Sequence, residues 1–433
     1  MTTSASSLLE RQTIARISWR VLPLIVIIYF VAQIDRTNVA FAQADLARLF
    51  GINPYLYGWG AGMFFIGYFF FEVPSNVILE RVGARRWIAR IMVTWGLVSA
   101  SMVFVQGPIS FFVIRFLLGV AEAGFFPGVL LYFTYWFPAQ YRARVVSALF
   151  MAVPGSNAVT AAVSGPLLNL DGMLGLAGWQ WLFLVESAPA VLLAPVVLWV
   201  LTDRPADAKW LTEEQRAWLD GRLQDERRAI EAKAKQKLTL KSALVDSRVL
   251  GLSAVYLTIV TATYGVVFFL PLIVRAQGMS DVSTGLVTAV PYTVGIVGMI
   301  LWARSSDRHH ERRWHFIVAA VLAAAGLAAS AAIANPLLGL LAISVATIGI
   351  YGSKPAFWPL PSQFLTGTAA AGGIALMNSI GNLGGFFGPQ IVGWIRQSSG
   401  GYSAGLYFLA SCALASAVIA AIVIPAERRQ PGG

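Results

Sequence analysis

The sequence is poor in the residues on which most redox and metal sites depend. It has one cysteine, Cys412, in 433 residues, which excludes an intrachain disulfide and a CxxC redox or zinc motif. Its three histidines, His309, His310 and His315, fall in one charged loop. We interpret that loop as a solvated turn and not as a metal site, because no set of carboxylates or thiols surrounds it. We therefore expect no metal and no bound cofactor, with the proton as the only coupling ion.

Charge is also scarce. Charged residues make up 12% of the chain and hydrophobic residues 57%, whereas soluble domains carry roughly 25% charged residues. The net charge of +11 comes mainly from short loops on one side of the predicted membrane, so it does not indicate nucleic-acid binding. No P-loop, HExxH or GxSxG motif is present, which argues against a nucleotide-driven pump and against an enzyme. The composition predicts an integral membrane protein.

Apolar stretches of about 20 residues, long enough to cross a bilayer as helices, recur along the whole chain. They lie near 20–42, 56–79, 87–106, 109–135, 145–169, 179–201, 249–274, 283–304, 314–334, 337–359, 370–395 and 403–425. The expected fold is therefore all-α, with twelve transmembrane helices in two six-helix bundles.

These bundles would span residues 20–201 and 249–426, between an N-terminal tail at 1–19 and a C-terminal tail at 427–433. A polar linker, 202–248, joins them. Within it, Thr212-Glu213-Glu214-Gln215 fits a capping box and predicts a cytoplasmic helix.

The two halves repeat. Gly51, Gly58 and the string Arg85-Arg86-Trp87 recur as Gly278, Gly285 and Arg312-Arg313-Trp314, all at one offset of 227 residues. Several matches at a common offset indicate two parallel repeats, which place a substrate site at their interface near the middle of the membrane.

Arginine placement sets the expected orientation, because cations accumulate in cytoplasmic loops. With the N-terminus inside, the internal loops hold most arginines, and the external side holds only Arg48, Arg275 and Arg396. Both termini are therefore expected in the cytoplasm.

Four charged residues lie inside apolar segments: Asp35, Arg36, Arg115 and Glu122. A charge at membrane depth costs at least ~3 kcal/mol, so it is usually functional. Arg115 and Glu122 are two helical turns apart and share a face, and Arg36 falls at a similar depth to Arg115. An anion that binds an arginine would compete with the neighbouring carboxylate, which would then take up a proton more readily. The alternative is a structural ion pair that only fixes helix packing.

Lys354 is the only lysine outside the linker, and it is followed by Pro355 in an apolar segment. It could act as a third cation that meets a second carboxylate, or it could extend to an interface as a snorkelling lysine. Further polar side chains in apolar segments could bind substrate or make contacts between helices. They are Gln33, Tyr68, Asn157, Tyr264, Tyr292, Asn378 and Asn382.

Two charged loops at corresponding places in the halves could form a latch that opens and closes during transport, or could serve topology alone. The candidate gating residues are Glu72, Glu80, Arg81, Gly83, Arg85, Arg86, Asp307, Arg308 and Arg312.

The chain resembles transporters of the major facilitator superfamily over essentially its full length. The matching strings include IDRTNVAFA at 34–42, GYFFFEVPSN at 67–76 and RFLLGVAEAGFFPG at 115–128. The Asp-Arg pair followed by Thr-Asn and the Arg-x6-Glu spacing are the most specific features among them. These are similar to the anion:cation symporter branch, which includes bacterial carriers for tartrate, phthalate and sugar acids.

The resemblance implies roles for matching residues. Asp35 and Glu122 would couple protons, Arg36 and Arg115 would organise the anion site, and Tyr68 and Asn378 would contact substrate. Two positions depart from the family pattern: Gln33 stands where a tyrosine is common in sugar-acid carriers, and Glu80 replaces the usual aspartate.

The sequence thus predicts a monomeric inner-membrane symporter, surrounded by lipid, that imports a small organic anion with protons. A dicarboxylate or hydroxy acid such as tartrate fits the extra cation Lys354, and an aromatic acid such as phthalate fits Phe357 and Trp358 beside it. Two other classes remain as alternatives: a membrane sensor of organic acids that does not transport, and a membrane-embedded enzyme.

Overall fold

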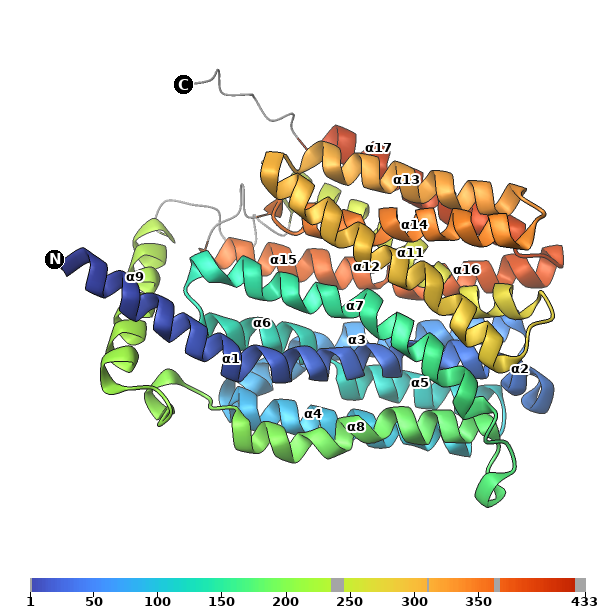
Figure 1. The fold of residues 1–433 in the computed structure, drawn as a ribbon, viewed down its shortest axis with the longest axis horizontal. Coiled ribbons are helices and arrows are strands. Elements are labelled where there is room, and N and C mark those ends of the chain that lie inside the picture. Colours follow the sequence, from blue (N-terminus) through green and yellow to red (C-terminus); the bar gives the residue numbers. More distant parts are fainter. Residues whose placement is uncertain (1, 235–244, 310, 362–366, 425–433) are drawn as a thin grey trace.

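The computed structural model describes residues 2–234, 245–309, 311–361 and 367–424, and the regular structure within these ranges is entirely helical. The helices of the two halves form two adjacent groups that run along the long axis of the molecule (Figure 1).

The first half contains α1 (Thr2–Thr37), α2 (Val39–Phe50), α3 (Pro54–Val82), α4 (Ala84–Ala100), the 3-10 helix η1 (Ser101–Phe104), α5 (Pro108–Glu122), α6 (Phe125–Trp136), α7 (Ala139–Leu168), η2 (Met173–Gly175) and α8 (Gly178–Val200). The linker contains η3 (Pro205–Asp207) and α9 (Glu213–Ala234). The second half contains α11 (Ser247–Arg275), α12 (Asp281–His309), α13 (Arg313–Ala332), α14 (Pro336–Phe357), α15 (Gly367–Asn382), α16 (Gly384–Ser399) and α17 (Ser403–Val423).

Eleven helical stretches of the described chain are long and apolar enough to cross a membrane. The twelfth predicted span, 370–395, is divided at Leu383 into α15 and α16, each of 16 residues. Each piece alone is shorter than the roughly 20 residues that cross a bilayer, so this crossing is built from both. The predicted fold class, two bundles of membrane-spanning helices, is confirmed.

Two other predicted spans are also interrupted. Asn38 separates α1 from α2, and Ala123 and Gly124 separate α5 from α6. Gly124 has φ +85°, a left-handed conformation that favours glycine. Backbone hydrogen bonds continue across both breaks: the Asn38 N–H donates to the Ile34 carbonyl oxygen and the Ala123 N–H to the Gly119 carbonyl oxygen, each at 2.9 Å.

The predicted N-terminal tail is helical where the structure describes it. Residues 2–19 are part of α1, which begins at Thr2. The C-terminal tail at 427–433 and the last residue of the predicted span 403–425 lie outside the described residues.

The halves pack closely at Gly58 and Gly285, two glycines that occupy matching positions of the sequence repeat. A side chain on Gly58 of α3 would collide with the carbonyl oxygen of Pro389 in α16. A side chain on Gly285 of α12 would collide with the carbonyl oxygen of Ala161 in α7. Small residues let helix backbones approach within a membrane. The α3–α16 and α7–α12 pairs therefore close the interface between the halves near the starts of α3 and α12.

The predicted capping box starts the linker helix α9. The Thr212 hydroxyl accepts from the Gln215 N–H, and the Gln215 side chain accepts from the Thr212 N–H, both at 3.2 Å. Glu226 of α9 pairs with Arg142 of α7 at 2.7 Å and accepts from the Ala139 N–H at 3.0 Å. This helix lies at the end of the molecule where α1 begins (Figure 1), which is the end opposite the close α3–α16 contact. Residues 235–244 of the linker lie outside the described ranges.

Candidate functional site

One cavity between the halves gathers eight of the nine predicted substrate-binding residues. They are Gln33, Arg36, Tyr68, Asn157, Tyr264, Lys354, Asn378 and Asn382. These side chains come from α1, α3 and α7 of the first half and from α11, α14 and α15 of the second. Of the described residues that line the cavity, none is an aspartate or glutamate.

The cavity is tight. About 40 Å³ of it is open to the centres of water molecules, which corresponds to roughly three waters at ~10–15 Å³ each. Contacts between the halves narrow it: Asn157 Nδ2 donates to the Tyr351 hydroxyl at 2.8 Å, and Phe150 stacks on Trp358 with ring centroids 5.5 Å apart. A dicarboxylate therefore enters only if the two halves move apart.

Arg36 is the cation that the first half presents to the cavity. Its Nε donates to Glu122 Oε1 at 2.7 Å, and its Nη2 lies 2.5 Å from the same oxygen. The guanidinium also lies over the Tyr68 and Phe64 rings, at 5.0 and 5.2 Å from their centroids. Glu122 is fully buried behind the arginine and does not line the cavity. The pair is therefore arranged so that an anion in the cavity meets Arg36 and not its carboxylate.

Arg115 lies at the depth of Arg36, as predicted, but does not line the cavity. Its guanidinium donates to the carbonyl oxygens of Gly60, Ala61 and Arg36, each at 3.4 Å. Arg115 also lies 5.5 Å from the centroid of Phe64, which thus contacts both arginines. The sequence predicted Arg115 as a residue that binds the anion directly. In the structure, backbone carbonyls of α3 and α1 instead hold its guanidinium behind the cavity.

Asp35 points away from the cavity, although its neighbour Arg36 lines it. Successive residues on a helix are about 100° apart around its axis. The Asp35 carboxylate accepts from Trp95 Nε1 at 3.0 Å and from Ser99 Oγ at 2.6 Å, both on α4. It is fully buried inside the first half. The sequence did not single out Trp95 or Ser99, because neither is unusual in an apolar helix.

Lys354 is the cation that the second half presents to the cavity. It lies on α14, immediately before Pro355, and is 9% exposed. Within the described part of the chain, the structure shows no hydrogen bond or ion pair for its ammonium group. Arg36 is neutralised by Glu122 and Lys354 is not matched by a carboxylate, so the cavity favours an anion.

Aromatic and hydroxyl side chains complete the lining, and the sequence analysis missed them. They are Tyr29, Thr37, Phe126, Phe150, Tyr256 and Thr263. Helical spacing in the sequence would have identified several of these cavity-lining residues. Tyr29, Gln33 and Arg36 share one face of α1, and Tyr256, Thr263 and Tyr264 share one face of α11.

The predicted gating residue Glu72 joins the two halves. Its carboxylate accepts from Asn378 Nδ2 at 3.0 Å and from Ser379 Oγ at 2.9 Å. Glu72 lies on α3 and its partners on α15, and it is 4% exposed. This contact lies toward the α9 end of the bundle, because Glu72 is 18 residues along α3 from Pro54. The contact joins Glu72, a predicted gating residue, to Asn378, a predicted substrate-binding residue. No spacing in the sequence indicates this contact.

The first charged loop contacts the start of the linker, just after α8. Asp203 Oδ1 accepts from the Arg85 N–H at 2.9 Å, and a side chain at Gly83 would press on the same carboxylate. Gly83 also has φ +99°, which glycine tolerates best. The remaining loop candidates, Glu80, Arg81 and Arg86, are exposed. Asp203 was not among the predicted residues.

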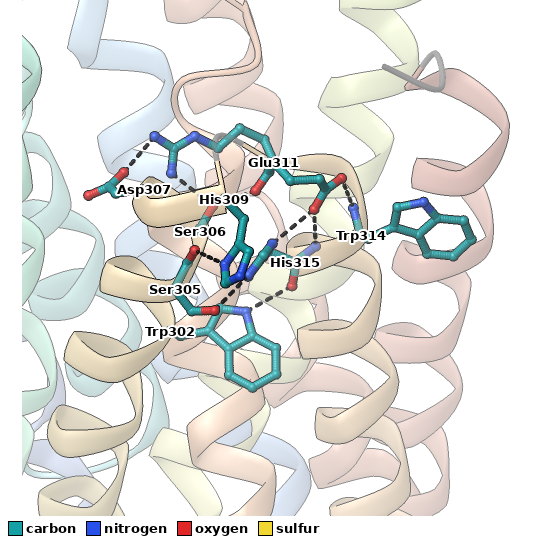
Figure 2. Close-up of polar contacts among 9 residues, drawn as sticks. Trp302, Ser305, Ser306, Asp307, His309, Glu311, Trp314 and His315 are labelled. Carbon is teal, nitrogen blue, oxygen red and sulfur yellow. Dashed lines mark hydrogen bonds and ion pairs between the residues drawn. The ribbon is translucent and has the colours of Figure 1, made fainter. Parts of the chain in front are cut away.

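The second charged loop joins α12 to α13 (Figure 2). Arg312 pairs with Asp307 at 2.6 Å and donates to Ser306 Oγ at 2.8 Å. Arg308 is exposed. The ion pairs that the structure shows for the second loop stay within the second half, and it shows none for residues 80–86 of the first loop. Glu72 makes one contact between the halves toward this end.

His315 departs from the expected solvated turn. Its Nδ1 lies 2.9 Å from Glu311 Oε2 and its Nε2 lies 3.1 Å from Ser305 Oγ, and its side chain is 18% exposed (Figure 2). Glu311 also accepts from the N–H groups of Trp314 and His315, at 2.6 and 3.0 Å, and so caps α13. Partial burial raises the pKa of Glu311. The hydrogen bonds from Trp314 and His315 lower the pKa by more than burial raises it, so it lies below its ordinary value. His310 lies outside the described residues.

Comparison with known proteins agrees with this architecture. A family model described as Major Facilitator Superfamily matches residues 25–389. The D-xylose-proton symporter structure has a TM-score of 0.74 and 16% identity, and the match covers 94% of this chain and 98% of that chain. At that identity the likeness shows the fold alone.

Two curated relatives are much closer in sequence. A protein of Agrobacterium vitis named "Putative tartrate transporter" is 47% identical over 96% of this chain and 92% of its own length. A "Quinolone resistance transporter" of Acinetobacter baumannii is 42% identical over 97% of both chains.

Proposed function

Because the chain belongs to the Major Facilitator Superfamily, a family of transporters and not of enzymes, we propose that it carries a small organic anion, together with protons, across the bacterial inner membrane. The observation that carries this proposal is the cavity shared by the halves. Arg36 enters it from one half and Lys354 from the other, and no described acidic residue lines it.

The two cations suit a substrate with two acceptor groups. Arginine binds carboxylates through a planar fork of donors, and lysine supplies a compact charge. Since they belong to different halves, a dicarboxylate or hydroxy acid that touches both would draw the halves together. The name of the Agrobacterium vitis relative supports tartrate as the first substrate to test.

Proton coupling rests on Glu122. An anion that approaches Arg36 competes with Glu122 for the same guanidinium, whose Nε donates to Glu122 at 2.7 Å. A carboxylate released from its cation inside an apolar bundle takes up a proton more readily than it remains charged. Substrate binding and proton uptake would then favour each other, as symport requires.

An aromatic carboxylate is the second candidate, favoured by the rings in the cavity wall. Tyr256 stacks on Phe357 at 5.1 Å and Trp358 stacks on Phe150 at 5.5 Å. The name of the Acinetobacter baumannii relative points in the same direction, because quinolones combine an aromatic ring system with a carboxylate.

The architecture supports alternating access, since the cavity lies between two halves that a rocking motion can separate on either side. The arginine distribution supports a cytoplasmic position for α9 and the start of α1. The end closed by Gly58 and Gly285 would then face the periplasm, and Glu72 would lie at the cytoplasmic gate. One chain encloses the cavity, which supports a monomer.

The test is uptake of labelled tartrate and labelled phthalate into proteoliposomes, with and without an inward proton gradient. Accumulation of either acid that requires the gradient supports the proposal, and the preferred acid distinguishes the two substrate classes. Binding without accumulation contradicts transport and favours a sensor. Accumulation that is indifferent to the gradient contradicts proton symport and leaves anion transport.

A further inference from the structure

Two threonines on α12, Thr284 and Thr288, carry buried hydroxyl groups that the proposed function has not used. Thr284 is 4% exposed and Thr288 is fully buried, and neither hydroxyl has a hydrogen-bond partner. A threonine within a helix commonly donates to the carbonyl oxygen four residues earlier, as Thr293 of the same helix does to Ala289 at 2.9 Å. A buried polar group without a partner is rare in a native protein and calls for an explanation.

Both threonines lie on the side of α12 that faces the protein interior. Residues four apart share a helical face, and Thr284, Thr288 and the buried Tyr292 follow that spacing. The other side of α12 carries exposed apolar side chains, among them Leu286 and Val290. The two hydroxyl-bearing side chains are therefore directed into the bundle and not toward lipid.

This part of α12 packs on α7 of the other half. A side chain on Gly285, next to Thr284, would collide with the carbonyl oxygen of Ala161. One turn earlier along α12, the carbonyl oxygen of Asp281 would collide with a side chain on Gly165. The threonines thus belong to the segment of α12 that closes the molecule at its outer end, by which we mean the end opposite α9.

The same face connects the outer surface with the substrate cavity. Asp281 lines a surface hollow that residues of both halves share. Tyr292 lies ~16 Å farther along α12, at 1.5 Å per residue, and its ring centroid is 6.5 Å from that of Tyr351. The Tyr351 hydroxyl accepts from Asn157, which lines the cavity. The two threonines therefore lie between the hollow and the cavity.

We propose that Thr284 and Thr288 line the path by which the anion reaches the cavity when the halves separate at the outer end, and that their hydroxyls hydrogen-bond to the hydrated anion as it passes. The inference rests on the proposed function and names two positioning residues for it. Separation of α12 from α7 brings water and the anion to both hydroxyls, which then gain the hydrogen bonds that they lack in the closed arrangement.

The first test is the exchange of labelled for unlabelled tartrate, or phthalate if it is the preferred acid, across proteoliposome membranes. The double variant Thr284→Val/Thr288→Val keeps the shape of both side chains and removes both hydroxyls. The double variant Thr284→Ser/Thr288→Ser keeps the hydroxyls and removes two methyl groups. Thr293→Val is the matched control, because Thr293 lies on the exposed side of the same helix and bonds only to that helix.

The path predicts that the valine pair slows exchange by about tenfold or more, the effect of ~1.4 kcal/mol in the barrier. The valine pair should neither weaken Kd nor lower Tm, and the serine pair and Thr293→Val should exchange at the wild-type rate. Unchanged exchange in the valine pair overturns the path. Slow exchange in the serine pair together with normal exchange in the valine pair would make the threonines packing residues, and this result also overturns it.

Thiol labelling tests the exposure of the path without relying on transport. In a Cys412→Ser background, a membrane-impermeant methanethiosulfonate reagent is added from the outer side to Thr284→Cys and to Thr288→Cys. Arg48→Cys is the positive control, since Arg48 is exposed and lines the hollow. Reaction at both threonine positions supports the path. Reaction at Arg48→Cys without reaction at either threonine position overturns it.

A proton gradient applied to the same vesicles separates this inference from the proposed function. Exchange that depends on the two hydroxyls but never becomes gradient-driven accumulation supports the path and contradicts symport. Gradient-driven accumulation that the valine pair leaves unchanged supports symport and contradicts the path.

Discussion

Glu122 accepts a hydrogen bond from Arg36 at 2.7 Å through one carboxylate oxygen, and its other oxygen is buried without a partner. Arg36 lines the cavity and Glu122 does not. In the proposed mechanism the arginine therefore stands between the anion and the carboxylate that takes up the proton. A ligand that binds Arg36 therefore changes the environment of the Glu122 carboxylate.

Glu122→Gln should abolish gradient-driven accumulation and leave exchange of labelled for unlabelled anion in place. Glutamine keeps the shape of the side chain but cannot take up the coupling proton or compete as an anion for Arg36. We expect anion affinity to rise, by about tenfold for each ~1.4 kcal/mol of competition removed. Uptake and counterflow in the same proteoliposomes measure both effects. The control is Glu226→Gln, which removes a carboxylate from α9, far from the cavity. Retained accumulation in Glu122→Gln would show that coupling lies elsewhere.

Lys354→Met should weaken anion binding and stabilise the protein. Loss of a charged donor is expected to cost about 1.5–3 kcal/mol of binding, or roughly tenfold to a hundredfold in Kd. Removal of a buried cation without a carboxylate partner relieves desolvation by about 1–3 kcal/mol. Titration calorimetry with tartrate and thermal unfolding test the two effects separately.

Ser353→Ala is the matched control for Lys354→Met, because Ser353 is also buried on α14 and bonds only to its own helix. A lower stability together with unchanged affinity in Lys354→Met would make the lysine a structural group and contradict its place in the site.

The sequence predicted most of the cavity because its polar side chains are rare in apolar segments. Gln33 and Arg36 share a helical face, and Lys354 stands out as the only lysine outside the linker. What helical spacing cannot show is which face of a helix meets the cavity and which face meets a neighbouring helix. Asp35 turns to α4 while Arg36 turns to the cavity, because α1 is packed on both sides.

Arg115 shows the same limit for a different reason. Its burial and its depth followed from sequence, but its partners are backbone carbonyls of α3, and a carbonyl carries no sequence signal. Likewise, Glu186 lies in an apolar span, and the sequence indicates neither its depth in the membrane nor a partner for its carboxylate. Its partner, Ser164, lies 22 residues away on another helix.

Glu72→Ala should open the side of the cavity that faces the α9 end of the molecule. It removes two hydrogen bonds between α3 and α15, and each bond to a charged group contributes about 1.5–3 kcal/mol. Spin labels on Arg81→Cys and Arg308→Cys, both exposed, in a Cys412→Ser background would report longer distances by pulsed electron resonance. Asn76→Ala is the control, since Asn76 bonds to the backbone of its own helix. Unchanged distances in Glu72→Ala would contradict its role as a gate.

Glu311→Gln should loosen the first turn of α13 at neutral pH. The pKa of Glu311 lies below its ordinary value of 4.5 in the folded protein, because the hydrogen bonds from Trp314 and His315 outweigh partial burial. Its stabilisation is therefore fully present above about pH 4.5 and is lost as the pH falls through the lowered pKa. We expect a loss of about 1 kcal/mol, typical of a helix cap.

Hydrogen exchange of the amides of Trp314 and His315 measures this effect. Exchange should be faster in Glu311→Gln than in the wild type at pH 7, and the difference should shrink below the lowered pKa of Glu311. Glu213→Gln, in the first turn of α9, is a control for a general effect of an acid near a helix start. An equal difference at all pH values would contradict the assignment.

The most direct measurement is proton movement driven by the anion alone. Proteoliposomes that contain a pH-sensitive dye are prepared with equal pH on both sides, and tartrate, or phthalate if it is the preferred acid, is added outside. The account predicts that the lumen acidifies as the labelled anion enters, and that Glu122→Gln vesicles preloaded with unlabelled anion take up the label by exchange without acidifying. Net entry of the anion into wild-type vesicles with no change in luminal pH would contradict proton-coupled transport through this site.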